Sequence, residues 1–121
     1  MEIVELRVGT WGVEEGYDVG SYSIVRCEAE QLGRWVMYLD DRRNRGVSYT
    51  IYRTSEGTIL VYVYEWSRWS NEVDSAMIHE YATLEEAAEH YRQILERAGV
   101  IPCRVMSLAE WRAQRKADAA E

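Results

Sequence analysis

The sequence predicts an α+β fold: an antiparallel sheet of about five strands in the N-terminal two-thirds, packed by a C-terminal helix, with a short second helix at the end. Three observations predict it. Segments rich in β-branched and aromatic residues fill the first two-thirds of the chain. A long apolar stripe of helical spacing that follows a capping box begins only at Thr83. Strand and helix patterns do not alternate, as they would in a βαβ protein. With 121 residues, the chain is long enough for a single domain over residues 1–121.

The first elements are two strands separated by a glycine-rich stretch. Residues 2–9 and 21–29 place apolar residues in a rough alternation that is typical of strands. Between them lie Gly12, Gly16 and Gly20, at four-residue spacing. Because glycine interrupts regular strands, this stretch indicates a loop or a broken strand.

The segment 30–41 fits two patterns. Four apolar residues have helical spacing: Leu32, Trp35, Val36 and Leu39. Residues 35–39, however, also form a continuous apolar run of the kind found in a buried strand. Trp, Val and Tyr favour strands, so a strand is the preferred interpretation and a helix the alternative. The charged sequence DDRRNRG then predicts a turn.

The clearest β-element is a hairpin of residues 48–54 and 58–66. Both segments are β-branched and aromatic, and the short loop Ser55-Glu56-Gly57 joins them. After the loop sequence WSRWSNEVD, residues 75–82 are predicted to form the last strand.

The helix beginning at Thr83 has a complete set of start and stop signals. Thr83 and Glu86 form a capping box, in which each side chain satisfies backbone amides of the first turn. An apolar stripe at spacings of three and four follows to Ala98. Gly99 is a C-terminal cap, and Pro102 prevents the helix from resuming.

A second capping box, Ser107 with Glu110, starts a short helix that carries Trp111. The apolar stripe is lost beyond Trp111, so residues 112–121 are predicted to fray.

The aromatic residues of the chain are 9 Tyr and 5 Trp, with no Phe, so every ring has a polar tip. Strand 58–66 concentrates them. Since successive residues point to opposite faces, Ile59, Val61 and Val63 share one face, which is suited to the stripe of helix 83–98. The other face consists of Leu60, Tyr62, Tyr64 and Trp66.

Two interpretations of that aromatic face stay open. A second layer could cover it, for example the segment 30–41 or the helix of Trp111. Alternatively, it is an exposed contact platform, because Tyr and Trp provide large contact areas and are enriched at binding hot spots. On the second interpretation, the candidate partner-binding residues are Tyr62, Tyr64, Trp66, Arg68 and Trp69.

The net charge of −7 opposes attraction to phosphate backbones and anionic membranes. It suits contact with a basic surface on another protein. The acidic residues that could supply such a face are Glu72, Asp74, Glu80, Glu85, Glu86 and Glu89. The only basic cluster near the sheet is Arg42, Arg43 and Arg45, which is the candidate nucleic-acid-binding set of the alternative function.

No catalytic or metal-binding pattern is readable. His79 and His90 are the only histidines, and neither has metal-ligand spacing with the other or with Cys27 and Cys103. The two cysteines are expected to be reduced thiols. We therefore expect no cofactor, no metal and no membrane partner, and a cytoplasmic location.

The function that the sequence predicts is a small non-catalytic interaction module, an accessory, adaptor or inhibitor subunit that binds a protein partner through the aromatic strand face and an acidic surface. The alternative is a nucleic-acid-binding subunit. Two further possibilities are a homodimer through an edge strand or the aromatic face, and a small enzyme with His79 as its acid or base.

Overall fold

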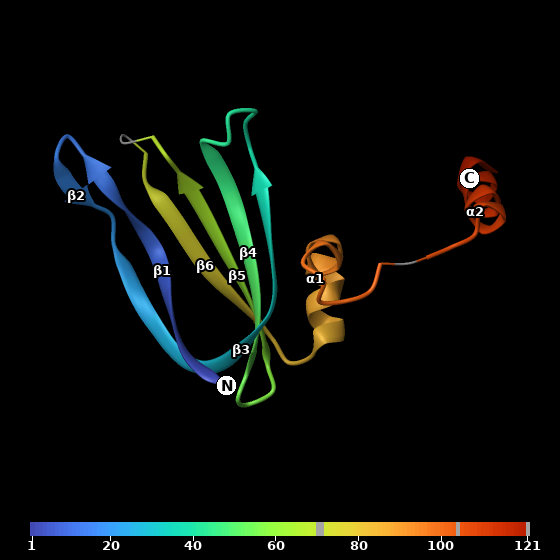
Figure 1. The fold of residues 1–121 in the computed structure, drawn as a ribbon, viewed down its shortest axis with the longest axis horizontal. Coiled ribbons are helices and arrows are strands. Elements are labelled where there is room, and N and C mark those ends of the chain that lie inside the picture. The colour runs from blue at the N-terminus through green and yellow to red at the C-terminus, as the bar shows by residue number, and fades with distance from the viewer. Residues whose placement is uncertain (70–71, 104, 121) are drawn as a thin grey trace.

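The structure, a computed structural model, describes residues 1–69, 72–103 and 105–120. Among these residues, an antiparallel sheet of six strands is followed by two helices (Figure 1). The strands are β1 (Glu2–Glu14), β2 (Tyr17–Val19), β3 (Tyr22–Tyr38), β4 (Arg45–Thr54), β5 (Ile59–Ser67) and β6 (Asp74–Tyr81), and the helices are α1 (Leu84–Arg97) and α2 (Leu108–Ala120). The α+β prediction is therefore confirmed, with one strand more than the expected five.

The strand order is β2-β1-β3-β4-β5-β6, and β1 also pairs with β6. This additional pairing joins Gly9, Thr10 and Trp11 of β1 to residues 76, 75 and 74 of β6. The row from β1 through β3, β4 and β5 to β6 therefore closes on itself at this short contact. One face of the sheet points into the enclosed space, which we call the inner face, and the other points outward.

The long strand β3 makes this closure possible. Its first half pairs with β1 and its second half with β4, and Figure 1 shows it sweeping from one to the other. The register shifts between Gln31 and Gly33, which marks a bulge between the two halves. A bulge bends the strand on which it lies, so β3 turns the corner between two parts of the sheet.

The preferred interpretation of the segment 30–41 was correct as far as Tyr38, where β3 ends. No helix forms in this segment, although its apolar residues have helical spacing. The bulge places Leu32 out of register with β4. Gly33 follows the bulge, at the point where the end of α1 meets the sheet. A Cβ atom at Gly33 would overlap the carbonyl oxygen of Ala98 and lie 2.8 Å from Val100 Cγ2.

The glycine-rich stretch after residue 9 is more regular than the sequence indicated. β1 continues through Gly12 to Glu14, turns at Glu15 and Gly16, and returns as the three-residue strand β2. This short hairpin is the additional strand. The predicted strand 21–29 is present as the first half of β3.

The hairpin of β4 and β5 and the last strand are confirmed. Residues 55–57 form the loop, in which the Gly57 amide donates to the Thr54 carbonyl at 2.9 Å. Ile51 and Val61 lie opposite each other on the outer face, and both are fully buried.

Helix α1 packs on the outer face, where its apolar stripe meets Ile51 and Ile59 through Ala87, Ala88 and Leu95. The predicted N-terminal cap is confirmed: the Glu86 amide donates to Thr83 Oγ1 at 3.1 Å. At the other end, Gly99 adopts a φ of 78°, the left-handed conformation that glycine accepts without strain. The amides of Gly99 and Val100 return to the carbonyls of Glu96 and Leu95, a Schellman motif.

Helix α2 stands apart from the sheet in Figure 1, and the side chains of residues 108–117 are exposed. The Glu110 amide donates to Ser107 Oγ at 3.1 Å, as the second capping box predicted. Residues 112–120 are helical. Fraying of this end stays a prediction, and residue 121 lies outside the described residues. In the part of the chain that the structure describes, neither helix is long and apolar enough to cross a membrane.

Candidate protein-interaction surface

The aromatic face of β5 is the inner face of the closed sheet. The Tyr62 hydroxyl donates to the Arg7 carbonyl of β1 at 2.6 Å, and the Tyr64 hydroxyl donates to Asp74 Oδ2 at 2.6 Å. Trp11 of β1 stacks on Tyr64 with a centroid separation of 5.4 Å. β1 therefore partly covers Tyr62 and Tyr64, and it is neither of the two elements that the sequence indicated.

Trp66 completes the row of polar tips. Its indole Nε1 donates to Ser48 Oγ of β4 at 3.2 Å. Gly46 lies opposite Trp66 in the register, and a Cβ atom there would overlap the indole ring. The three aromatic tips of the strand thus all donate hydrogen bonds within the fold, which explains why Tyr and Trp occupy these positions where Phe would leave the acceptors without a donor.

Burial affects how these tyrosines ionise. The pKa of Tyr64 is raised well above its ordinary value, first by burial and then by its hydrogen bond to the Asp74 carboxylate. Burial likewise raises the pKa of Tyr62. Both hydroxyls therefore stay protonated donors throughout the neutral range.

The loops at one end of the sheet are tied together. Arg45 Nε donates to Glu72 Oε2 at 3.0 Å, and Arg45 Nη2 contacts the other oxygen of the same carboxylate. This hydrogen bond is the main cause that lowers the pKa of Glu72 and raises that of Arg45. The Arg68 amide also donates to the Asn44 carbonyl at 2.8 Å. The loop between β3 and β4 and the start of the loop between β5 and β6 are therefore one surface.

Two arginines of this surface lie against aromatic rings. The Arg43 guanidinium is 4.9 Å from the centroid of the Tyr38 ring, and that of Arg68 is 5.8 Å from the centroid of the Trp66 ring. The Tyr38 and Trp66 rings meet edge to face at 5.9 Å. A planar guanidinium stacked on a ring presents both apolar area and hydrogen-bond donors to a partner.

Large apolar side chains are also exposed in the same two loops. The exposed fraction is 47 % for Trp69, 58 % for Leu39 and 48 % for Val73. We call the set the loop-end surface. It consists of Tyr38, Leu39, Arg43, Trp66, Arg68, Trp69 and Val73.

The structure divides the residues that the sequence singled out. Tyr62 and Tyr64 point to the interior, whereas Arg68 and Trp69 are exposed on the loop-end surface and Trp66 is half-buried at its base. The alternative set lies at the same end: Arg43 belongs to the surface, Arg45 is paired with Glu72, and Arg42 is exposed in the neighbouring turn. Two candidate sites of the sequence are therefore neighbours in the fold.

The sequence interpretation missed Tyr38, Leu39 and Val73. The signal that could have found them is the order of hairpins. In an antiparallel meander, the turn after β3 and the turn after β5 fall at the same end of the sheet. The exposed residues that flank both turns were therefore predictable neighbours.

The acidic candidates do not form one face. Glu72 and Asp74 lie at the loop end, where Asp74 accepts hydrogen bonds from Tyr64 and from the Ser67 amide. Glu80, Glu85, Glu86 and Glu89 lie at the end of β6 and along α1. Glu80 accepts from Thr58 Oγ1, and Glu86 from the Ala82 amide.

The two histidines contact aromatic rings. His79 lies 5.8 Å from Tyr91 and His90 stacks at 5.3 Å on Tyr81, both measured between ring centroids. Over residues 1–69, 72–103 and 105–120, no three His, Cys, Asp or Glu side chains are grouped so that they could hold a metal ion.

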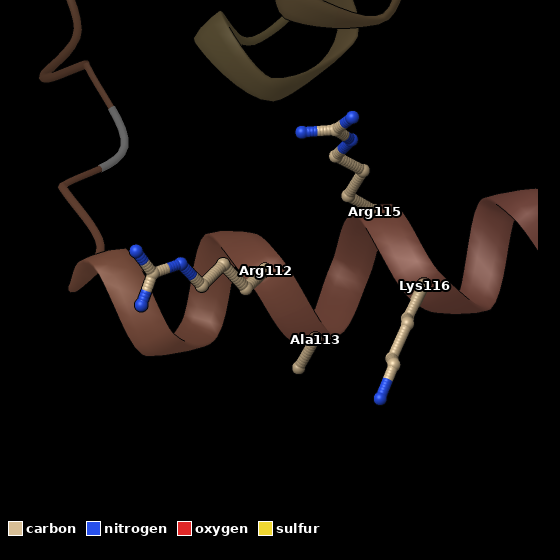
Figure 2. Close-up of a pocket in the computed structure, with 4 residues that line it drawn as sticks. All are labelled: Arg112, Ala113, Arg115 and Lys116. Atoms are coloured by element: carbon tan, nitrogen blue, oxygen red, sulfur yellow. The ribbon is translucent and has the colours of Figure 1, made fainter.

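A hollow of about 560 Å³ beside α2 is lined by Arg112, Ala113, Arg115 and Lys116. Figure 2 shows Arg115 and Lys116 pointing to opposite sides of the helix. The Arg115 guanidinium lies 5.4 Å from the Trp111 ring centroid, on the same helix. Side chains that diverge from a single exposed helix do not converge on a ligand.

No family model matches the chain, and no curated protein and no solved structure matches it either. No function is therefore carried over from a relative.

Proposed function

We propose that this protein is a small non-catalytic interaction module, an accessory, adaptor or inhibitor subunit, that binds a protein partner through the loop-end surface. The observation that supports it is the exposure of Trp69 at 47 %, next to arginines that are stacked on rings. Tryptophan and arginine are the residues most enriched at binding hot spots.

The loop-end surface also has the rigidity that a binding site needs. The ion pair of Arg45 with Glu72 and the backbone hydrogen bond from Arg68 to Asn44 connect the two loops. Trp66 is anchored below them by its hydrogen bond to Ser48. A contact surface that is already ordered loses less conformational entropy when a partner binds.

Most of the acidic residues that the sequence singled out are not part of the loop-end surface. Four of them, Glu80, Glu85, Glu86 and Glu89, lie away from the loop end, on β6 and α1. A partner that contacts Trp69 and a partner that contacts these carboxylates would therefore occupy separate surfaces.

The proposal is tested by replacing Trp69 with Ala in the tagged full chain and capturing partners from a lysate of the organism that encodes it. We expect a stoichiometric protein partner to bind the unmodified chain and to be lost with Trp69→Ala. Trp111→Ala is the matched control, because Trp111 is equally exposed, at 45 %, but lies on α2. Equal capture by both variants would refute the proposal. Circular dichroism of each variant checks the fold.

Nucleic-acid binding is the second candidate, because Arg43 lies over the exposed Tyr38 ring, on which a base could stack, and Arg42 is exposed next to it in the chain. Interleaved Asp40, Asp41 and Glu72 oppose it by their charge. Nuclease treatment of the lysate distinguishes the two functions, since a direct protein partner survives digestion. Arg42→Glu with Arg43→Glu is the variant for this alternative. Arg45 is left unchanged in this variant, because replacing it would break its ion pair with Glu72 and disturb the loops.

A further inference from the structure

The edge of β6 that faces away from β5 is paired along only part of its length. β1 pairs with residues 74–76 and then departs. Within the residues that the structure describes, no strand pairs with this edge at residues 77–81. On the other side, these five residues pair with β5 in unbroken register. This part of β6 is therefore a regular edge whose backbone groups, on the side away from β5, have no strand partner among the described residues.

The opposite edge, on β1, is less available. The Arg7 carbonyl of β1 already accepts the Tyr62 hydroxyl at 2.6 Å. An acceptor with a donor in place offers less to an added strand. Residues 77–81 of β6 contain neither Pro nor Lys, two residues that commonly protect strand edges from pairing, although this is equally true of residues 2–8 of β1. Met77 is 51 % exposed on this strand.

A cavity of about 260 Å³ adjoins this edge on the inner face. Its apolar wall comes from three strands: Val25 of β3, Leu60 of β5 and Ile78 of β6. A strand added beside β6 would place every second side chain on this inner face. An apolar side chain opposite Ile78 would therefore have a cavity to fill.

The polar wall of the same cavity is acidic. Glu56 and Glu80 line it, and no Arg or Lys does so among the described residues. Glu28 also lines it, but alternation along β3 directs the Glu28 side chain to the face opposite Val25. Glu80 is two positions along β6 from Ile78, so it lies on the same inner face. A carboxylate at a strand edge disfavours apolar or acidic strands and favours one that brings a cation to that position.

We propose that this edge of β6 and its cavity form a strand-addition site for an extended basic peptide segment of another protein. The bound segment pairs its backbone with residues 77–81. It places an apolar side chain opposite Ile78 and an arginine or lysine, two residues away, beside the carboxylates of Glu56 and Glu80. This site is separate from the loop-end surface and does not depend on the function proposed for it.

The test uses a fluorescein-labelled hexapeptide, threonine-valine-threonine-arginine-threonine-valine, titrated with the full-length protein and followed by fluorescence anisotropy. We expect saturable binding that weakens with salt. The matched peptide with glutamate in place of arginine should not bind. Equal binding of the two peptides, or no binding of either, would overturn the proposal.

Backbone pairing is tested with two N-methylated forms of the peptide, one methylated on its threonines and the other on its valines and arginine. A strand directs the N–H groups of alternate residues to opposite edges, so only one form should lose binding. Retention of binding by both forms would show that the peptide does not add as a strand.

Glu56→Gln and Glu80→Gln test the acidic wall, and each should weaken binding by up to roughly fivefold. Glu14→Gln, an exposed change on β1, is the control. The other possible occupant of this edge is a second copy of this chain. Sedimentation of the protein at the concentration used in the titration shows whether it forms a dimer. A dimer that the peptide dissociates would assign the edge to self-association and overturn the proposal.

Discussion

The two faces of β5 are covered in different ways. On the outer face, the helix α1 covers Ile51 and Ile59, and the fully buried residues of this contact are all aliphatic. The polar-tipped rings on this side, Tyr81 and Tyr91, are only partly buried and pack around that contact. On the inner face, β1 packs over Tyr62 and Tyr64: the Tyr62 hydroxyl donates to the Arg7 carbonyl, and Trp11 stacks on Tyr64. The Tyr64 hydroxyl donates to Asp74 of β6. A helix satisfies its own backbone, so it can lie on a dry face. A strand has backbone groups at its edges, and the side chains facing them must supply donors.

The largest expected effect comes from breaking the dry face. Leu95→Ala removes a fully buried side chain of α1 that packs against the sheet. We expect the free energy of unfolding to fall by about 2–5 kcal/mol, because the change loses apolar burial and leaves a cavity. Urea denaturation measures it. Arg92→Ala, at an exposed position of the same helix, should change stability by less than about 0.5 kcal/mol. A loss below about 1 kcal/mol for Leu95→Ala would mean that α1 does not bury this face.

Breaking one bond of the inner face should cost less. Tyr62→Phe removes the donor to the Arg7 carbonyl and keeps the ring. We expect a loss of about 0.5–1.5 kcal/mol in the same denaturation experiment. Tyr49→Phe on the outer face is the control, because the Tyr49 hydroxyl bonds to no described residue. Equal losses from the two changes would remove the distinction between the faces.

The smallest expected effect is a loss of stability at alkaline pH, which tests the inner face through Tyr64. The folded pKa of Tyr64 is raised by burial and by Asp74, so the folded state keeps a proton that the unfolded chain releases near pH 10. Stability is therefore fully present below about pH 10 and falls as the pH rises further. Unfolding free energies measured from about pH 8 to about pH 11 should decline less steeply for Tyr64→Phe than for the unmodified chain. Parallel declines would show that Tyr64 ionises normally.

Local chemistry predicted much of this fold. The β4–β5 hairpin and both helix caps follow from signals within a few residues of one another, such as Thr83 with Glu86. The predicted face of Ile59 and Val61 was also correct, because alternation along a strand is a local property. The segment 30–41 was harder, since its helical spacing competes with a bulge that only the pairing with β4 reveals.

The closure of the sheet was not predictable in the same way. The pairing of Thr10 with Ser75 joins the first strand to the last, and nothing near either residue signals the other. The covering of Tyr62 and Tyr64 depends on that closure, so their inward direction could not be read from the strand itself. Trp69 was predictable as exposed, because it lies in a loop beyond the end of β5.

The short contact between β1 and β6 also has a consequence for how the chain folds. Each hairpin from β3 to β6 closes a short loop, whereas the contact of residues 9–11 with residues 74–76 closes nearly the whole sheet. The entropy lost on closing a loop grows with its length, so this contact is the most costly pairing to form. Folding rates fall as contacts become more distant in sequence. The contact that brings β1 over the aromatic face therefore has the largest loop-closure cost, although it involves only three residues of each strand.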